Sequence, residues 1–149
     1  MPIKIKHLTQ EDLLDFTSLI HLFNTVFEEE SKIGGEAHLL SLLHNKSFIA
    51  LVALSENKVV GGLTAYELPM YYSDSSELFL YDLAIQPDHQ RMGIGKALLQ
   101  HLTEYCVKKE IKEFFVMAHE EDLHAIEFYH ATGGIAEKVV NFLYKTSEE

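Results

Sequence analysis

The sequence predicts an α/β (α+β) fold, in which a mixed sheet has helices on both faces. Two segments with helical periodicity come first, a hairpin pattern follows them, and strands then alternate with helices. The chain has 149 residues, of which 47% are hydrophobic and 11% aromatic, which is enough for one substantial core. We therefore expect residues 1–149 to form a single domain.

The N-terminal segments have the periodicity of helices. From Thr9 to about Glu29, apolar residues recur at helical spacing, and Thr9 with Asp12 three positions later can cap the start. The charged and glycine-containing residues 28–35 end this pattern. A second, shorter helix is expected from about Glu36 to His44.

A β-hairpin is expected after these helices. Phe48 to Leu54 and Val59 to Leu68 form its strands, and residues 55–58 form its turn. Glu77 to Ile85 (ELFLYDLAI) is apolar enough for a central strand that is covered on both faces. The remaining expected elements are a helix from about Gly95 to Lys109, a strand from Phe114 to Ala118, a helix from Asp122 to about Thr132 and a last strand from Val139 to Lys145.

Composition limits the class of protein and its partners. With 23 acidic and 12 basic side chains, the formal net charge is −11, which repels nucleic acid and attracts cationic small molecules. Acidity for solubility alone is the other explanation. No apolar run approaches the roughly 20 residues that span a bilayer, and the N-terminal residues lack a signal peptide's apolar stretch. These observations predict a cytoplasmic protein with no membrane association. Cys106 lies beside Leu102 and Tyr105 on an apolar helix face, which favours a core thiol over a nucleophile.

A glycine-containing turn follows the central strand and opens the next helix. Such a turn directs unpaired backbone amides and the positive end of a helix dipole at one point, where phosphate can bind. Gly93 and Gly95 allow close approach of a diphosphate, and Arg91 and Lys96 add positive charge. The spacing fits neither the dinucleotide fingerprint nor the Walker A motif. A bare helix-capping turn is the alternative.

Two motifs resemble those of the GNAT superfamily of acetyltransferases. Residues 90–95 (QRMGIG), preceded by residues 83–87, resemble the acetyl-CoA motif Q/R-x-x-G-x-G/A. Residues 125–133 (AIEFYHATG) resemble the later A-x-x-x-Y-x-x-x-G pattern, whose tyrosine is here Tyr129. The resemblance covers nearly the whole chain and implies a mostly antiparallel sheet and acetyl-CoA as cosubstrate. The cofactor-binding residues it implies are Leu83, Ala84, Ile85, Gln90, Arg91, Met92, Gly93, Ile94, Gly95, Lys96 and Tyr129.

Within this superfamily, the chain is similar to the aminoglycoside 3-N-acetyltransferases of the gentamicin type. The similar segments are residues 46–51 (KSFIAL), 65–66 (AY) with 68–69 (LP), 81–84 (YDLA) and 89–94 with the pattern H-x-R-x-G-I. The resemblance implies acetyl transfer to an amine of an aminoglycoside-like substrate, with a role in antibiotic resistance. His119 and the final Leu143-Tyr144 depart from the pattern, which leaves the substrate open.

Acetyl transfer needs a deprotonated amine, a polarised thioester carbonyl and a stabilised leaving thiolate. Asp82 is the candidate base that binds the substrate ammonium, and Tyr81 would orient the same end. The backbone amide near Leu83 would polarise the carbonyl, because family members splay two strands there. Tyr129 is the candidate acid facing sulfur. A structural aspartate and a core tyrosine are the alternatives for Asp82 and Tyr129.

Acidic side chains are the candidates for binding a cationic acceptor. Glu120 and Asp122 follow the fifth predicted strand, and Asp122 is favoured by its position in the family pattern. Glu28, Glu29, Glu30, Glu121 and Glu67 are weaker candidates, since charge runs are usually solvated surface. The histidines have no metal-ligand spacing, so we expect no metal.

Other functions stay open at this stage. The acceptor could be a polyamine, an amino acid or a protein lysine, or the chain could be a non-catalytic CoA-binding module. The presence of both Asp82 and Tyr129 argues against the module. A homodimer formed by pairing or swapping of the last strand is also open.

Overall fold

A computed structural model describes residues 2–30 and 33–148 of the chain. Ser31 and Lys32, which belong to the segment expected to end the first helix, lie outside the described residues. The chain divides into two compact units, Met1–Met117 and Ala118–Glu149, and each unit is described by itself.

The first unit is built on a five-stranded sheet with the strand order β1-β2-β3-β4-β5. Neighbouring strands are antiparallel except for β4 and β5, which are parallel. This mixed, mostly antiparallel sheet is the one that the sequence predicts. The strands are β1 (Lys4–His7), β2 (Phe48–Ser55), β3 (Lys58–Pro69), β4 (Ser76–Ile85) and β5 (Phe114–Val116).

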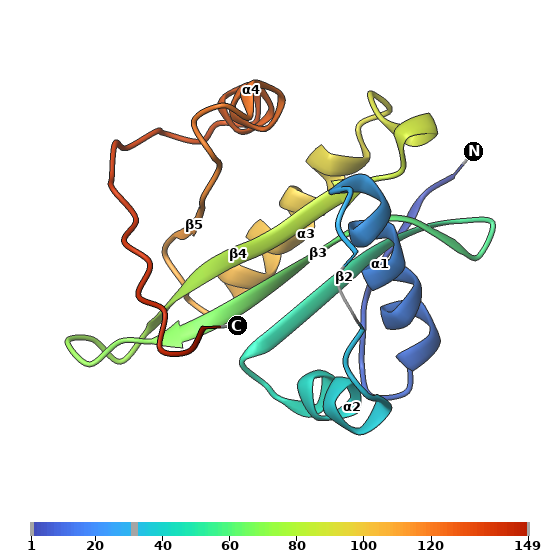
Figure 1. The fold of residues 1–149 in the computed structure, drawn as a ribbon, viewed down its shortest axis with the longest axis horizontal. Coiled ribbons are helices and arrows are strands. Elements are labelled where there is room, and N and C mark those ends of the chain that lie inside the picture. The colour runs from blue at the N-terminus through green and yellow to red at the C-terminus, as the bar shows by residue number, and fades with distance from the viewer. Residues whose placement is uncertain (1, 31–32, 149) are drawn as a thin grey trace. The chain divides into compact units, whose positions relative to one another are not determined.

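Helices cover both faces of this sheet, with α1 and α2 on one side and α3 on the other (Figure 1). Neighbouring side chains in a strand point to opposite faces, so alternate side chains of β2 pack against α1 and α2. These are Phe48, Ala50, Val52 and Leu54. The helices are α1 (Leu13–Val26), α2 (Glu36–His44) and α3 (Ile94–Lys108), with a single 3₁₀ turn, η1 (Pro87–His89), before α3.

A glycine lets α1 lie close to the centre of the sheet. A Cβ at Gly62 in β3 would lie 2.5 Å from Cδ1 of Leu19 and 2.6 Å from the carbonyl oxygen of Leu51. Leu19 is fully buried in this core. The absence of a side chain at Gly62 therefore sets how closely α1 approaches β3.

Among its described residues, the second unit contains one helix, α4 (Leu123–Ala131), and a C-terminal segment without regular secondary structure. The Asp122 carboxylate caps α4, accepting a 3.1 Å hydrogen bond from the amide of Ala125. The predicted strand from Val139 to Lys145 is wrong, since this segment has no strand pairing in the described residues. Its apolar side chains are exposed, Val139 by 73% and Tyr144 by 87%. Residues with high β propensity do not form a strand unless a neighbouring strand supplies backbone hydrogen bonds.

Strand β1, which has only four residues, is not predicted from the sequence. Its pairing partner is β2, with Lys4 opposite Leu54 and His7 opposite Leu51. A four-residue edge strand gives too short an alternation to be recognised before its partner is known. Among the described residues, no helix is both long and apolar enough to cross a membrane.

Candidate acetyl-transfer site

The pairing of strand β4 with its neighbouring strands changes at Tyr81. Toward β3, Thr64 pairs with Asp82 and Ala65 pairs with Leu80, so Tyr81 is an extra residue that forms a β-bulge. Toward β5, pairing covers only Leu78 to Leu80. From Tyr81 to Ile85, β4 therefore has a neighbouring strand on one side only within the first unit. The β4 edge beside Leu83, where splayed strands are expected, is therefore unpaired within the first unit.

The bulge places two consecutive side chains on the face that α1 and α2 cover. The Tyr81 ring contacts the ring of Tyr66, at a centroid distance of 5.6 Å. Asp82 interacts electrostatically with Glu29, which follows α1. Neighbours in a regular strand would point to opposite faces. Tyr81 and Asp82 therefore meet at one surface, as the proposed binding of one substrate end by both residues requires.

The Asp82 carboxylate is half-buried and lies near another acidic side chain. Burial raises the pKa of Asp82, and the nearby charge of Glu29 raises it further. Among the described residues, no hydrogen bond or ion pair to its carboxylate is present. A carboxylate in this state is a stronger base than a solvated one and attracts a cation.

The turn after β4 has the backbone shape that phosphate binding needs. Gly93 has a left-handed conformation, with φ of +82°, and Arg91 has φ of +63°. Gly93 is the N-cap of α3, and its carbonyl accepts the first helical bond, from the amide of Ala97 at 3.0 Å. The backbone amides of residues 91–96 have no hydrogen-bond partner among the described residues. This arrangement leaves donors for an anion at the positive end of the α3 dipole.

The predicted cofactor residues take different parts in this turn. Arg91, Met92 and Lys96 are exposed, whereas Ile94 and Gly95 are buried. The Gln90 side chain donates a 3.1 Å hydrogen bond from Nε2 to the carbonyl oxygen of Ile85. Gln90 therefore ties the turn to the end of β4.

At the end of β4 the main chain, rather than the side chains, is available to a ligand. Ala84 and Ile85 are buried, at 4% and 9% exposure, and Leu83 is half-buried. The unpaired edge of β4, the free amides and the exposed cations fit a long ligand that carries a thioester at one end and phosphates at the other. The residues present therefore fit acetyl-CoA.

The remaining predicted site residues belong to the second unit. Tyr129 is half-buried in α4, and its ring lies 5.2 Å from that of Phe128. Glu120 is exposed, and Asp122 is used as the α4 cap. The roles of these three residues toward a substrate stay predictions.

Glu67 and Cys106 lie at a structural cluster on the α3 side of the sheet. Glu67 accepts hydrogen bonds from the hydroxyls of Tyr105 and Ser76, each at 3.2 Å. Burial raises the pKa of Cys106 to about 11, and Glu67 contributes to this shift. Cys106 is the buried, unreactive thiol that the sequence predicts. Glu67, a weak candidate for acceptor binding, is instead held by its structural partners.

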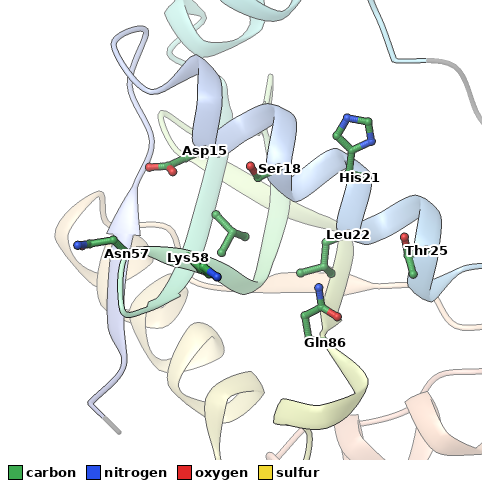
Figure 2. Close-up of a pocket in the computed structure, with 9 residues that line it drawn as sticks. Asp15, Ser18, His21, Leu22, Thr25, Asn57, Lys58 and Gln86 are labelled. Carbon is green, nitrogen blue, oxygen red and sulfur yellow. The ribbon is translucent and has the colours of Figure 1, made fainter.

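A separate hollow of about 380 Å³ lies between α1 and the turn that joins β2 to β3. Figure 2 shows Asp15, Ser18 and Thr25 of α1 on one side, with Lys58 and Gln86 below them. Asp15 is already paired with Lys6, at 3.5 Å. None of the residues predicted to bind substrate or cofactor lines this hollow, and we assign it no role.

Only part of this site has a signal in the sequence beyond the predicted residues. The apolar alternation of β4 slips by one position, from Leu78 and Leu80 to Leu83 and Ile85, and such a slip indicates a bulge. The aromatic residues that surround Tyr81 come from several strands, so no local pattern reveals them. Within the described residues, no group of His, Cys, Asp and Glu side chains could hold a metal ion.

The chain belongs to the acetyltransferase (GNAT) family, whose model matches residues 16–133. This match confirms the predicted family and the class of enzyme that it defines, an acetyltransferase.

Solved structures of similar proteins extend this result. The aminoglycoside acetyltransferase meta-AAC0020, from an uncultured soil metagenomic sample, is 41% identical over 97% of both chains. Its TM-scores are 0.95 for the complex with trehalose and 0.94 for the complex with sisomicin. A second aminoglycoside acetyltransferase from such a sample, HMB0005, is 32% identical, with a TM-score of 0.94, over 99% of this chain and 100% of that one.

A curated relative of different specificity matches a shorter segment. The [ribosomal protein bS18]-alanine N-acetyltransferase of Escherichia coli (strain K12) is 30% identical over 73 residues, or 49% of this chain. The chain spans about half the length of this relative, 48%.

Proposed function

We propose that the chain transfers the acetyl group of acetyl-CoA to an amine of an aminoglycoside, at the 3-amino position. The observation that carries this proposal is the bulge in β4, which sets Tyr81 and the poorly solvated Asp82 side by side at the start of an unpaired strand edge. The similarity to two aminoglycoside acetyltransferases over almost the whole chain supports the acceptor class. The 3-amino position rests on the sequence resemblance.

In the proposed reaction, Asp82 binds the acceptor ammonium and takes its proton, directly or through water. The free amine attacks the thioester carbonyl carbon, whose oxygen is polarised by a backbone amide near Leu83. The carbon–sulfur bond then breaks, and the nitrogen releases its second proton as the amide forms. Tyr129 gives its proton to the leaving sulfur, and the proton released by the nitrogen restores the Tyr129 phenol through water. The role of Tyr129 rests on the pattern of residues 125–133.

Electrostatics supports a cationic acceptor. The formal net charge is −11, and the charge that raises the pKa of Asp82, after burial, is that of the acidic Glu29. A polycationic aminoglycoside is attracted to such a surface and offsets the charge of Glu29 and Asp82.

A second acceptor class is supported by the alanine N-acetyltransferase relative, which acts on a ribosomal protein. An amino acid, a polyamine or a protein amine could use the same base and the same cofactor turn. The coverage of that relative is half of this chain, whereas the aminoglycoside acetyltransferases match nearly all of it.

A thiol-release assay separates these classes. Acetyl-CoA is supplied with gentamicin, kanamycin, spermidine or a lysine peptide, and free CoA is measured. The buried, high-pKa Cys106 thiol keeps the protein's own background low in this assay. Preferential turnover of an aminoglycoside is the expected result, and NMR of the product then identifies the acetylated nitrogen. Preferential turnover of spermidine or peptide would reject the proposed acceptor.

A further inference from the structure

A row of aromatic rings runs across the sheet from the core to the site. Successive ring centroids lie 5.7 Å apart for Phe16 and Phe48, 5.3 Å for Phe48 and Tyr66, and 5.6 Å for Tyr66 and Tyr81. On the β5 side, Phe79 lies 5.5 Å from Tyr81 and is stacked on Phe115 at 4.8 Å, with the two planes at 5°. The Tyr81 ring stands edge-to-face to the rings of Tyr66 and Phe79, at 82° and 72° between planes. The four rings of Tyr66, Phe79, Tyr81 and Phe115 therefore form one connected aromatic cluster, which we call the aromatic platform.

The platform is covered at one end and open at the other. Phe16 and Phe48, which lead to it, are 2% and 7% exposed, as core residues are. Tyr81 is 56% exposed and Phe115 is 39% exposed. Aromatic rings that serve only the core are normally covered, so the open rings are available to a ligand.

The open end of the platform is next to negative charge. Asp82 follows Tyr81 in the bulge. Burial raises the pKa of Tyr66, and Tyr81 and Asp82 raise it further, so the Tyr66 hydroxyl shares their surroundings. Glu29 acts on the Asp82 carboxylate from the end of α1. The surface thus offers the exposed aromatic rings of Tyr81 and Phe115 with an anion beside Tyr81.

This combination suits one kind of amine. Rigid carbohydrate rings carry apolar C–H faces that pack on aromatic rings, and an attached ammonium can then reach the carboxylate and the electron-rich ring face. A flexible linear polyamine satisfies the carboxylates but gains little from a flat surface, and ordering its chain costs conformational entropy.

We propose that the aromatic platform is a specificity-determining surface, which holds an acceptor ring against Tyr81 while its ammonium meets Asp82. The platform selects amines carried on a saturated ring over amines on a flexible chain. This inference rests on the proposed acetyl transfer and adds the residues that discriminate between acceptors.

The kinetic test compares Tyr81→Leu with wild type on kanamycin and on spermidine. Loss of the ring is expected to lower kcat/KM for kanamycin about tenfold, or roughly 1.4 kcal/mol, mainly through KM, because the ring contact is lost. The kcat/KM for spermidine is expected to change less than about twofold. If spermidine is not acetylated, its inhibition constant is measured instead, with the same expectation. Tyr81→Phe keeps the ring and the wild-type preference. Tyr72→Leu, in the exposed loop between β3 and β4, is the control that changes neither acceptor.

Equal losses on kanamycin and spermidine would overturn the platform, as would a loss in Tyr81→Phe that matches that of Tyr81→Leu. The first result would mean that Tyr81 serves the chemistry in general. The second would mean that its hydroxyl, and not its ring, is what the acceptor needs.

A binding test keeps the platform separable from the proposed reaction. The chain has no tryptophan, so Tyr81→Trp introduces a single fluorescent reporter on the platform. Kanamycin is expected to shift its emission saturably, while Tyr72→Trp does not respond. A response to kanamycin without any acetylation would reject the reaction and retain the platform. Emission that is already blue-shifted and unchanged by kanamycin would show a ring covered by protein, which overturns the platform.

Discussion

Two carboxylates on opposite sides of the same sheet have opposite surroundings. Glu67 faces α3, where the hydroxyls of Tyr105 and Ser76 each donate a hydrogen bond to it. Asp82 faces the α1 side, where burial raises its pKa and the nearby charge of Glu29 raises it further. A satisfied carboxylate stabilises the fold, whereas a poorly satisfied one retains affinity for protons and cations. Both carboxylates are half-buried, so the difference between them lies in whether hydrogen-bond donors accompany the burial.

The largest expected effect separates these two acids directly. Asp82→Asn is expected to lower kcat/KM by about 10² or more, since the substituted amide cannot accept the acceptor's proton. Glu67→Gln has the same isosteric change and is expected to leave kcat/KM within about twofold. Its cost is about 1 kcal/mol of unfolding free energy, measured in denaturant, because a charged acceptor of two hydrogen bonds is lost. Near-wild-type turnover of Asp82→Asn would reduce Asp82 to scaffolding.

Two tyrosines allow the same comparison. Tyr129→Phe is expected to lower kcat by about 10² with little change in acetyl-CoA affinity, because the sulfur loses its proton donor. Tyr105→Phe removes a hydroxyl whose pKa is raised to about 12 by burial and by Glu67. That variant should lose stability and keep its kcat. Steady-state kinetics with both substrates varied measures the difference, and an unchanged kcat in Tyr129→Phe would remove its acid role.

A glycine pair tests the phosphate turn. Gly93→Ala is expected to raise the KM for acetyl-CoA about tenfold and to cost about 1 kcal/mol of stability, because a side chain strains the left-handed backbone. Gly35→Ala is the control. At both Gly35 and Gly93 an added Cβ meets no atom within 4 Å, but of these two residues only Gly93 has a positive φ. Equal KM values for the two variants would argue against phosphate binding at this turn.

The smallest expected effect concerns stability and pH. The folded-state pKa of Asp82 is raised, so its contribution to stability is fully present below its unfolded pKa and is lost as pH rises through the folded value. At neutral pH, the Asp82 carboxylate of the wild type is charged while it is half-buried beside Glu29, which destabilises the folded state. Asp82→Asn should therefore unfold at higher denaturant concentration than wild type at pH 7, and the difference should vanish toward pH 3. A variant that is less stable at pH 7 would show that the Asp82 charge is well solvated or paired.

The sequence predicted most of the fold because its helices and strands have strong local signals. α2 has the predicted limits, and β2 to β4 differ from prediction by a residue at most ends. The C-terminal strand failed because pairing depends on a partner that local apolar content does not supply.

The site was predictable where a motif lies in one segment and not where it joins several. Residues 90–96 form the expected turn because glycine conformation and helix capping are local. The platform joins Tyr66, Phe79 and Phe115 from three strands. Glu67 is hydrogen-bonded to Tyr105 of α3, whereas Asp82 lies near Glu29, which follows α1. Those contacts follow from strand register, which sequence alone left open.

The most direct test of which side of the sheet binds the acceptor is amide NMR of the 17.0 kDa protein during titration with kanamycin. We predict saturable shift changes for Phe79, Tyr81, Asp82 and Phe115, with the amides of Glu67 and Tyr105 unchanged. Changes centred on Glu67 and Tyr105, with Tyr81 and Asp82 unaffected, would contradict the assignment of the acceptor to the open side of the sheet.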